Sequence, residues 1–153
     1  MPRMTLRKFF GLVPFLSTQN PIVRIVRRRV GALGGSRREY VAHKERARLL
    51  VHQKLITLNQ HYGMVFNKVA IRNQRSRWGS CSKKGNLNFN YRIIYLPEAL
   101  QDYLIVHELC HLAMFNHSKQ FWALVAEVIP DHEVRRRALT RYAKQRHGAN
   151  VSN

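Results

Sequence analysis

Acidic side chains are scarce in this sequence, in which eight Asp and Glu residues stand against 27 Lys and Arg residues in a chain of 153. The resulting formal net charge of +19 favours association with polyanions such as nucleic acid, ribosomes or an anionic membrane surface. A net charge does not define a specific site, and a basic surface that is merely solvated accounts for it equally well. The composition therefore makes a nonspecific nucleic-acid association possible without requiring it.

Cysteine and long apolar runs are scarce as well. Cys81 and Cys110 are the only cysteines, too few for the disulfide framework of a small secreted domain, so we expect buried thiols and a cytoplasmic location. No stretch approaches the roughly 20 apolar residues of a membrane-spanning helix. The apolar run Phe9–Leu16 is short, contains a proline and lacks a small-x-small cleavage site. We therefore expect neither an export signal nor a transmembrane segment.

Hydrophobic residues make up 45% of the sequence, which is typical of a globular chain with a core of its own. The composition changes along the chain. Residues 1–35 are predicted to be a basic, poorly ordered N-terminal arm, because arginines and glycines interrupt every apolar run there. One folded domain is predicted over residues 36–148, followed by a short tail over residues 149–153.

Hydrophobic periodicity predicts an α+β fold for this domain. The predicted elements are a long amphipathic helix over 37–62 with Ser36 in a capping box, strands over Met64–Asn73 and Leu87–Leu96, a helix from Pro97 to about Met114, a helix from Ser118 to Pro130, and a last helix from Asp131 to about Gly148. A turn at residues 83–86 precedes the second strand. The strands are expected to form a small antiparallel sheet, with two helices at the C-terminal end of the chain.

The stretch richest in chemistry is His107-Glu108-Leu-Cys-His111, an HExxH pattern followed by His117. Helical residues four apart lie about 40° apart around the axis and roughly 6 Å apart along it, so His107 and His111 can bind one ion. Glu108 flanks that ion, where a general base for a metal-activated water would lie. A catalytic zinc takes three protein ligands, and His117 is the natural third. The sequence thus predicts a Zn²⁺ site of His107, His111 and His117, with Glu108 as the catalytic residue.

Two alternatives to a catalytic zinc stay open for this stretch. A buried helix can carry two histidines by coincidence, although an ionisable trio in an apolar helix would then pay desolvation without a compensating partner. A structural zinc is the second possibility, and it would need a fourth protein ligand such as Cys110. Cys110 lies about 60° behind His107 on the helix and points partly away from Glu108, which argues against that role.

Several further motifs accompany the histidines and glutamate. They are Ser76-Arg-Trp-Gly-Ser-Cys-Ser82, Asn90-Tyr-Arg92, Leu96-Pro97, Asp102-Tyr103, Asn116-His117-Ser118 and Phe121-Trp122. With them the chain resembles the YgjP-like family of small zinc metallopeptidase domains, related to the WLM and SprT-like proteases, over roughly residues 36–145. The resemblance implies a zincin-like α+β domain, zinc bound by the three histidines, a water polarised by Glu108, and a protein or peptide substrate.

Peptide hydrolysis is the reaction that fits these residues, because zinc polarises a carbonyl and Glu108 can pass a proton to the leaving amine. Arg92, Tyr91 and His132 are candidates for the oxyanion partner that such a reaction needs. A metal-dependent ribonuclease is an alternative, since a bacterial family that matures ribosomal RNA spaces three histidines in the same way. That family carries glycine where this chain has Glu108. A nucleic-acid-associated basic binding protein is the remaining alternative.

Overall fold

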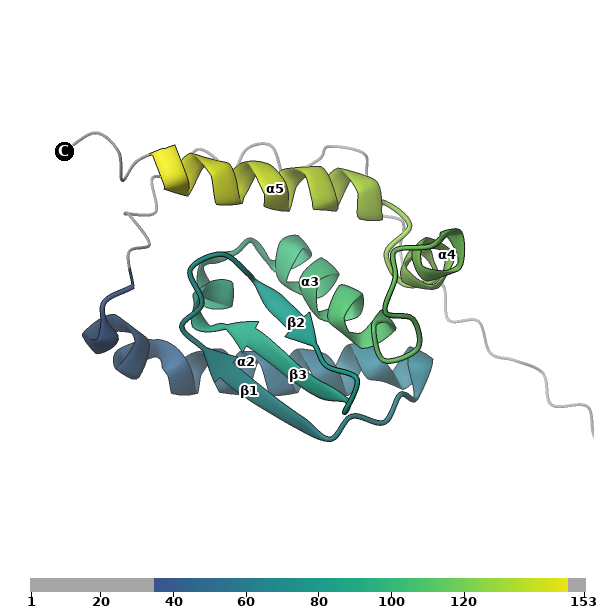
Figure 1. Ribbon diagram of the computed structural model, residues 1–153, viewed down its shortest axis with the longest axis horizontal. Coiled ribbons are helices and arrows are strands. Elements are labelled where there is room, and N and C mark those ends of the chain that lie inside the picture. Colours follow the sequence, from purple (N-terminus) through teal and green to yellow (C-terminus); the bar gives the residue numbers. More distant parts are fainter. Residues whose placement is uncertain (1–34, 149–153) are drawn as a thin grey trace, which may run out of the picture.

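The structure is a computed structural model that describes residues 35–148, with side chains described as far as Ala143. Along the chain its elements are α2 (Arg37–Tyr62), β1 (Lys68–Arg72), β2 (Gly79–Cys81), β3 (Asn86–Asn90), the 3₁₀ helix η1 (Tyr91–Tyr95), α3 (Glu98–Cys110), α4 (Lys119–Ala126) and α5 (His132–Gly148) (Figure 1). This arrangement confirms the α+β class, the long first helix and the two helices after α3. The predicted arm at 1–35, except Gly35, and the tail at 149–153 lie outside the described residues, so the domain boundaries stay a prediction.

The long helix α2 begins and ends where the sequence predicts. The Ser36 side chain accepts a hydrogen bond from the backbone N–H of Glu39 at 3.1 Å, which satisfies one of the free donors in the first turn. Gly63 ends the helix in the left-handed conformation with φ of 60°, and its N–H donates to the carbonyl of Asn59. One face of the helix buries Ala47, Val51 and Leu55 in the core.

The sheet is mixed, so the predicted purely antiparallel sheet is wrong. Its strand order is β1-β3-β2: β2 pairs with β3 antiparallel, whereas β1 pairs with β3 parallel. The reason lies in β2, a three-residue strand of Gly, Ser and Cys that has no hydrophobic alternation to reveal it. Because β2 reverses the chain once more between β1 and β3, those two strands run in the same direction. The free edge near α3 therefore belongs to β2, and β3 lies in the middle.

The second predicted strand, Leu87–Leu96, is only half correct. Strand β3 ends at Asn90, and the chain continues as η1. The Asn90 side chain caps this helix by accepting from the backbone N–H of Arg92 at 3.1 Å, and its amide donates to the carbonyls of Gln74 and of Arg77. An asparagine that bonds the local backbone in this way competes with the strand ladder. It also ties β3 to the loop that leads into β2.

Helix α3 is the central element and is buried on nearly every side. It lies between α2 and α5, beside the sheet, and α4 lies beyond one of its ends (Figure 1). One set of its buried residues, including Leu104 and Leu109, joins a core with α2 and the sheet. A second set, including Val106 and Cys110, joins Phe121 and Val125 of α4. The last turn of α3 is thereby held between two cores.

At the surface between α2 and α3, an ion pair reinforces this packing. The Lys54 ammonium lies 2.6 Å from Asp102 and 3.1 Å from Glu98. The position of both carboxylates in the first turns of α3 also suits the positive end of that helix. None of the helices in residues 35–148 combines the length and the apolar character needed to span a bilayer.

Candidate metal centre

Three imidazoles converge at the C-terminal end of α3. His107 belongs to the last turn of the helix, and His111 is its C-cap. The chain then turns through residues 112–116 and returns to the same point at His117, which directly precedes Ser118, the N-cap of α4. The Nε2 atom of His107 lies 3.1 Å from Nε2 of His111 and 3.1 Å from Nε2 of His117. The three ligand atoms all lie within 4.8 Å of one another. Such a group could hold a metal ion.

The donor chemistry of this cluster fits a metal. Two nitrogens bound tetrahedrally at roughly 2.0–2.1 Å from one ion lie roughly 3.3 Å apart, which is close to the spacing of the Nε2 atoms. The Nδ1 atom of His111 lies 2.9 Å from the carbonyl oxygen of Met114, an acceptor only, so Nδ1 carries the proton. With the proton on Nδ1, the Nε2 atom of the imidazole keeps a free lone pair, and Nε2 faces the other two rings. Hydrogen bonds of this kind fix the tautomer of metal-binding histidines.

Phe121 and Trp122 of α4 form an aromatic wall around the imidazoles. The fully buried Phe121 ring lies 5.1 Å from the ring of His107, 4.6 Å from that of His111 and 4.9 Å from that of His117, measured between centroids. Trp122 stacks on His117 at 5.4 Å with 23° between the ring planes. These contacts remove water from one side of the cluster and restrict the rotation of all three rings. The sequence analysis named Phe121-Trp122 among the motifs that accompany the histidines, but nothing in the sequence indicated that the two rings contact them.

Burial and mutual proximity keep the rings of His107 and His117 neutral. Burial, followed by the neighbouring His111 and His117 rings and by the charge of Arg136, lowers the pKa of His107 to about 3. Burial, followed by His111 and Arg136, also lowers the pKa of His117. At pH 7 neither ring carries a second proton that a cation would have to displace.

Glu108 is buried directly after His107, with 5% of its surface exposed. Burial raises the pKa of its carboxyl to about 8, and within the described residues its Oε2 atom is buried without a hydrogen-bond partner. Its neighbour in space is strand β2: a Cβ atom added to Gly79 would lie only 2.5 Å from Oε1 and 2.8 Å from Cγ of Glu108. Only glycine lets the backbone of β2 approach the carboxyl this closely.

A cavity of about 220 Å³ opens beside this carboxyl. His107 and Glu108 share its lining with Tyr103 of α3, Leu139 of α5 and the segment 77–79. The tyrosine ring lies 5.8 Å from the ring of His107. The carboxyl and one of the three imidazoles are therefore reached from one space, which lies between β2, α3 and α5.

The remaining candidate residues lie apart from the three histidines. Cys110 does not join them: it is fully buried between α3 and α4, and burial raises the pKa of its thiol to about 11. Tyr91 is fully buried in the core, and Arg92, which is 9% exposed, donates to the side chain of Asn90 at 3.0 Å. Neither lines the cavity beside Glu108. His132 stacks on Trp122 at 5.3 Å, so one ring separates it from His117.

Comparisons with known proteins point to metallopeptidases. A family described as YgjP-like, metallopeptidase domain, matches residues 19–142, a span that begins within the predicted N-terminal arm. The fold is similar to the crystal structure of the metallopeptidase zymogen of Pyrococcus abyssi abylysin, with a TM-score of 0.54 and 26% identity over 62% of this chain and 93% of that chain. The metallopeptidase zymogen of Methanocaldococcus jannaschii jannalysin has a TM-score of 0.42 and 23% identity over 58% of this chain and 91% of that chain. No match was found among curated proteins.

Proposed function

This chain belongs to the YgjP-like metallopeptidase family, and from that premise we propose that it hydrolyses peptide bonds with a zinc ion held by His107, His111 and His117 and with Glu108 as the general base. The observation that carries the proposal is the convergence of three Nε2 atoms next to a buried carboxyl. Three nitrogen ligands leave a fourth position open, which is the arrangement of catalytic rather than structural zinc sites.

In this proposal the three histidines bind the zinc ion and fix its position next to Glu108. The hydrogen bond from Nδ1 of His111 to Met114 directs the Nε2 lone pair of His111 toward the other two rings, and the wall of Phe121 limits access of bulk water to that point. A zinc ion bound there would supply a Lewis acid that lowers the pKa of a water molecule toward about 7 and polarises the substrate carbonyl. Cys110 takes no part, because its buried thiol lies outside the group of ligand atoms.

Glu108 moves the proton. Its carboxylate accepts a proton from the attacking water and delivers it to the leaving amine, which requires a group that can exist in both forms near neutral pH. Burial raises the pKa of this carboxyl to about 8, and the positive charge of a bound cation would favour the ionised form again. The close approach of Gly79 restrains the side chain, so the carboxyl is oriented before substrate binds.

The edge of β2 is the surface on which a substrate backbone fits best. Strand β2 is at the edge of the sheet, and its first residue, Gly79, touches Glu108. An extended peptide that pairs with this edge would run past the buried carboxyl and the cavity beside it. Backbone pairing of this kind selects unfolded or extended polypeptides rather than one sequence, which is consistent with a protein or peptide substrate.

Digestion of unfolded casein and of RNA side by side, with and without a chelator, tests the proposed function against the ribonuclease alternative. We expect casein to be cleaved, cleavage to stop in the chelator and to return with added zinc, and RNA to stay intact. Cleavage of RNA with intact casein would refute the proposal. RNA that is bound but not cut, with an affinity that falls steeply with salt, would leave only the predicted nonspecific association through the basic surface.

Gly79→Ala is expected to lower kcat/KM for a peptide substrate by roughly 10- to 100-fold, because the added methyl group occupies the space of the Glu108 carboxyl and must displace it. The buried side chain has little room to move, so the free energy of unfolding should also fall, by about 1–3 kcal/mol. Metal content should stay at the wild-type level, since the three atoms nearest to a Cβ added at Gly79 all belong to Glu108 and none to a histidine.

Gly85→Ala is the matched control, at the turn between β2 and β3. Gly85 has a φ of 69°, and an added Cβ there would meet no atom closer than 3.5 Å. The substitution should reduce stability by about 1–2 kcal/mol through backbone strain and leave kcat/KM unchanged. Equal losses of activity in the two variants would show that Gly79 acts only through stability and that its contact with Glu108 is irrelevant to turnover.

A further inference from the structure

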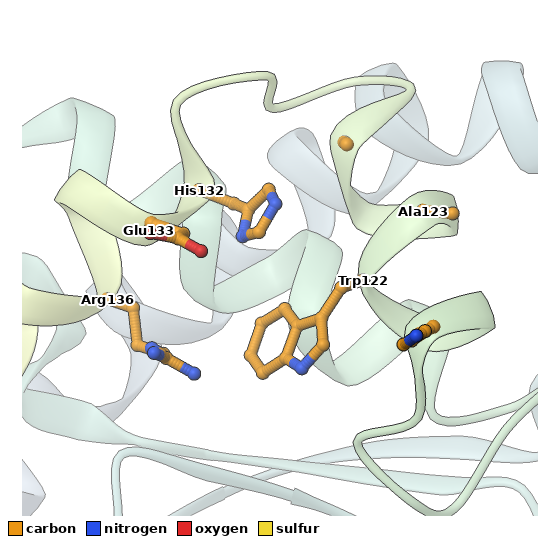
Figure 2. A pocket seen from close by; sticks show the side chains of 7 residues that line it. Trp122, Ala123, His132, Glu133 and Arg136 are labelled. Carbon is orange, nitrogen blue, oxygen red and sulfur yellow. The ribbon is translucent and has the colours of Figure 1, made fainter.

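A second cavity, of about 320 Å³, lies between α4 and α5. Figure 2 shows the indole of Trp122 extending from α4 toward His132, Glu133 and Arg136 on the first turns of α5, and Ala123 of α4 also belongs to the lining. Lys119 completes the polar part of the lining. The proposed peptidase mechanism uses none of these side chains.

Trp122 connects this cavity to the metal centre. Its indole stacks on His117 at 5.4 Å and also on His132 at 5.3 Å, so the same ring is part of the wall around the histidines and part of the lining of the second cavity. The guanidinium carbon of Arg136 lies 4.9 Å from the centroid of the indole. One indole ring therefore lies between the second cavity and His117.

The charges around the cavity leave one guanidinium available. On the first turns of α5, Arg135 lies 2.9 Å from Asp131 and Arg137 lies 3.2 Å from Glu133. Arg136, between them, makes no ion pair and no side-chain hydrogen bond among the side chains described as far as residue 143, and its guanidinium lies over the ring of Trp122. Glu133, the acidic residue in the lining, already has Arg137 as its partner.

We propose that this cavity is a specificity subsite that binds a carboxylate of the peptide substrate, with Arg136 as the residue that recognises it. A guanidinium binds a carboxylate through two parallel hydrogen bonds, and the indole face accommodates the methylene groups that lead to it. Lys119 adds a second positive charge. The carboxylate belongs either to an acidic side chain near the scissile bond or to the C-terminus of the peptide. This inference rests on the proposed function, because it assumes that a peptide occupies the metal centre.

The test uses internally quenched peptides of neutral sequence in which one Glu is moved from position to position, each matched by a peptide with Gln. A further pair ends in a free carboxylate or in an amide. For the wild type we expect kcat/KM to be about tenfold higher with Glu than with Gln at one or two positions, and unchanged elsewhere. Arg136→Gln should abolish this preference, and Arg136→Glu should reverse it in favour of Lys at the same position. The terminal pair shows which carboxylate the cavity takes.

Arg141→Gln is the matched control, because it removes the same charge from an exposed position on the same helix, about 140° around the axis from Arg136. This variant should keep the positional preference. A preference for Glu that is equal at all positions, or that falls equally in the Arg136 and Arg141 variants, would reflect the net charge of +19 and overturn the proposal.

Binding separates failure of the subsite from failure of the proposed function. In Glu108→Gln protein, peptide binding can be measured without turnover. We expect the dissociation constant of the preferred Glu peptide to be about tenfold below that of the matching Gln peptide. In the double variant that also carries Arg136→Gln, this difference should vanish. If no peptide is cleaved by the wild type, the peptidase function fails, and the binding difference still decides the subsite. If peptides are cleaved and bound without any preference, the subsite is refuted and the function stands.

Discussion

Glu108→Gln is expected to retain the metal and to lose peptide hydrolysis by roughly 10²- to 10⁴-fold, the range that a positioned general base contributes. The amide has the shape of the carboxyl, so it fits the buried space beneath Gly79. It cannot accept a proton from water. The measurement is kcat on a quenched peptide together with zinc per chain by elemental analysis, for the variant and the wild type in parallel.

The control for this substitution is Glu45→Gln on α2, which makes the same chemical change at a carboxylate that is 63% exposed and pairs with Lys44 and Arg48. Its turnover should equal that of the wild type. Undiminished turnover in Glu108→Gln would remove the general-base assignment. Loss of zinc together with turnover would instead show that Glu108 helps to hold the ion.

The same variant has a second readout in the metal-free protein. The pKa of Glu108 is raised by burial from 4.5 to about 8, so the folded state keeps its proton where the unfolded state has lost it. The stability that this group contributes is therefore full below pH 4.5 and is lost as the pH rises toward 8. His107, with a pKa lowered to about 3, acts in the opposite direction but only below about pH 6.5. Between pH 7 and 8 the free energy of unfolding should decrease in the wild type and stay level in Glu108→Gln.

The parts of the fold that local chemistry specifies could be predicted from the sequence. Ser36 and Gly63 delimit α2 because a hydroxyl satisfies free amides at one end and a left-handed glycine ends the other. Ser118 begins α4 for the same reason. The spacing of His107 and His111 on a helix brought their rings together, with Nε2 atoms 3.1 Å apart.

The parts that depend on contacts between distant segments could not be predicted. Strand β2 has no periodic pattern, since its three residues are held by pairing with β3 rather than by their own propensity. Because the sequence analysis did not predict β2, it made β1 antiparallel to β3, whereas the two strands are parallel. Gly79 was visible only as one residue of the motif Ser76–Ser82, because its proximity to Glu108 joins residues that are 29 positions apart. The cavity beside Arg136 likewise needs α4 and α5 to be placed side by side.

His117→Ala and His111→Ala are each expected to weaken zinc binding by more than roughly 100-fold. Mutating a residue that only hydrogen-bonds to a metal ligand typically costs roughly 10- to 100-fold, and losing the ligand itself should cost more. Each removes one of three nitrogen donors, and the two donors that remain fall short of the three protein ligands that a catalytic zinc takes. Elemental analysis after dialysis against a weak chelator measures the loss, with His52→Ala as a control, since His52 is exposed on α2 and lies outside the cluster. Zinc retained in full by both cluster variants would mean that other residues complete the site.

Thermal unfolding with and without zinc distinguishes a ligand from a packing residue. His117 is exposed, and its imidazole nitrogens have no hydrogen-bond partner in the described chain other than His107, so His117→Ala should melt close to the wild type when both are free of metal. His111→Ala should melt lower even then, because it loses the hydrogen bond to Met114, which contributes about 1 kcal/mol. Added zinc should raise the melting temperature of the wild type, since an ion that binds only the folded state stabilises it, and should raise that of His117→Ala far less. A large drop for metal-free His117→Ala, with the zinc-induced rise preserved, would mean that this residue supports the turn between α3 and α4 and does not bind the ion.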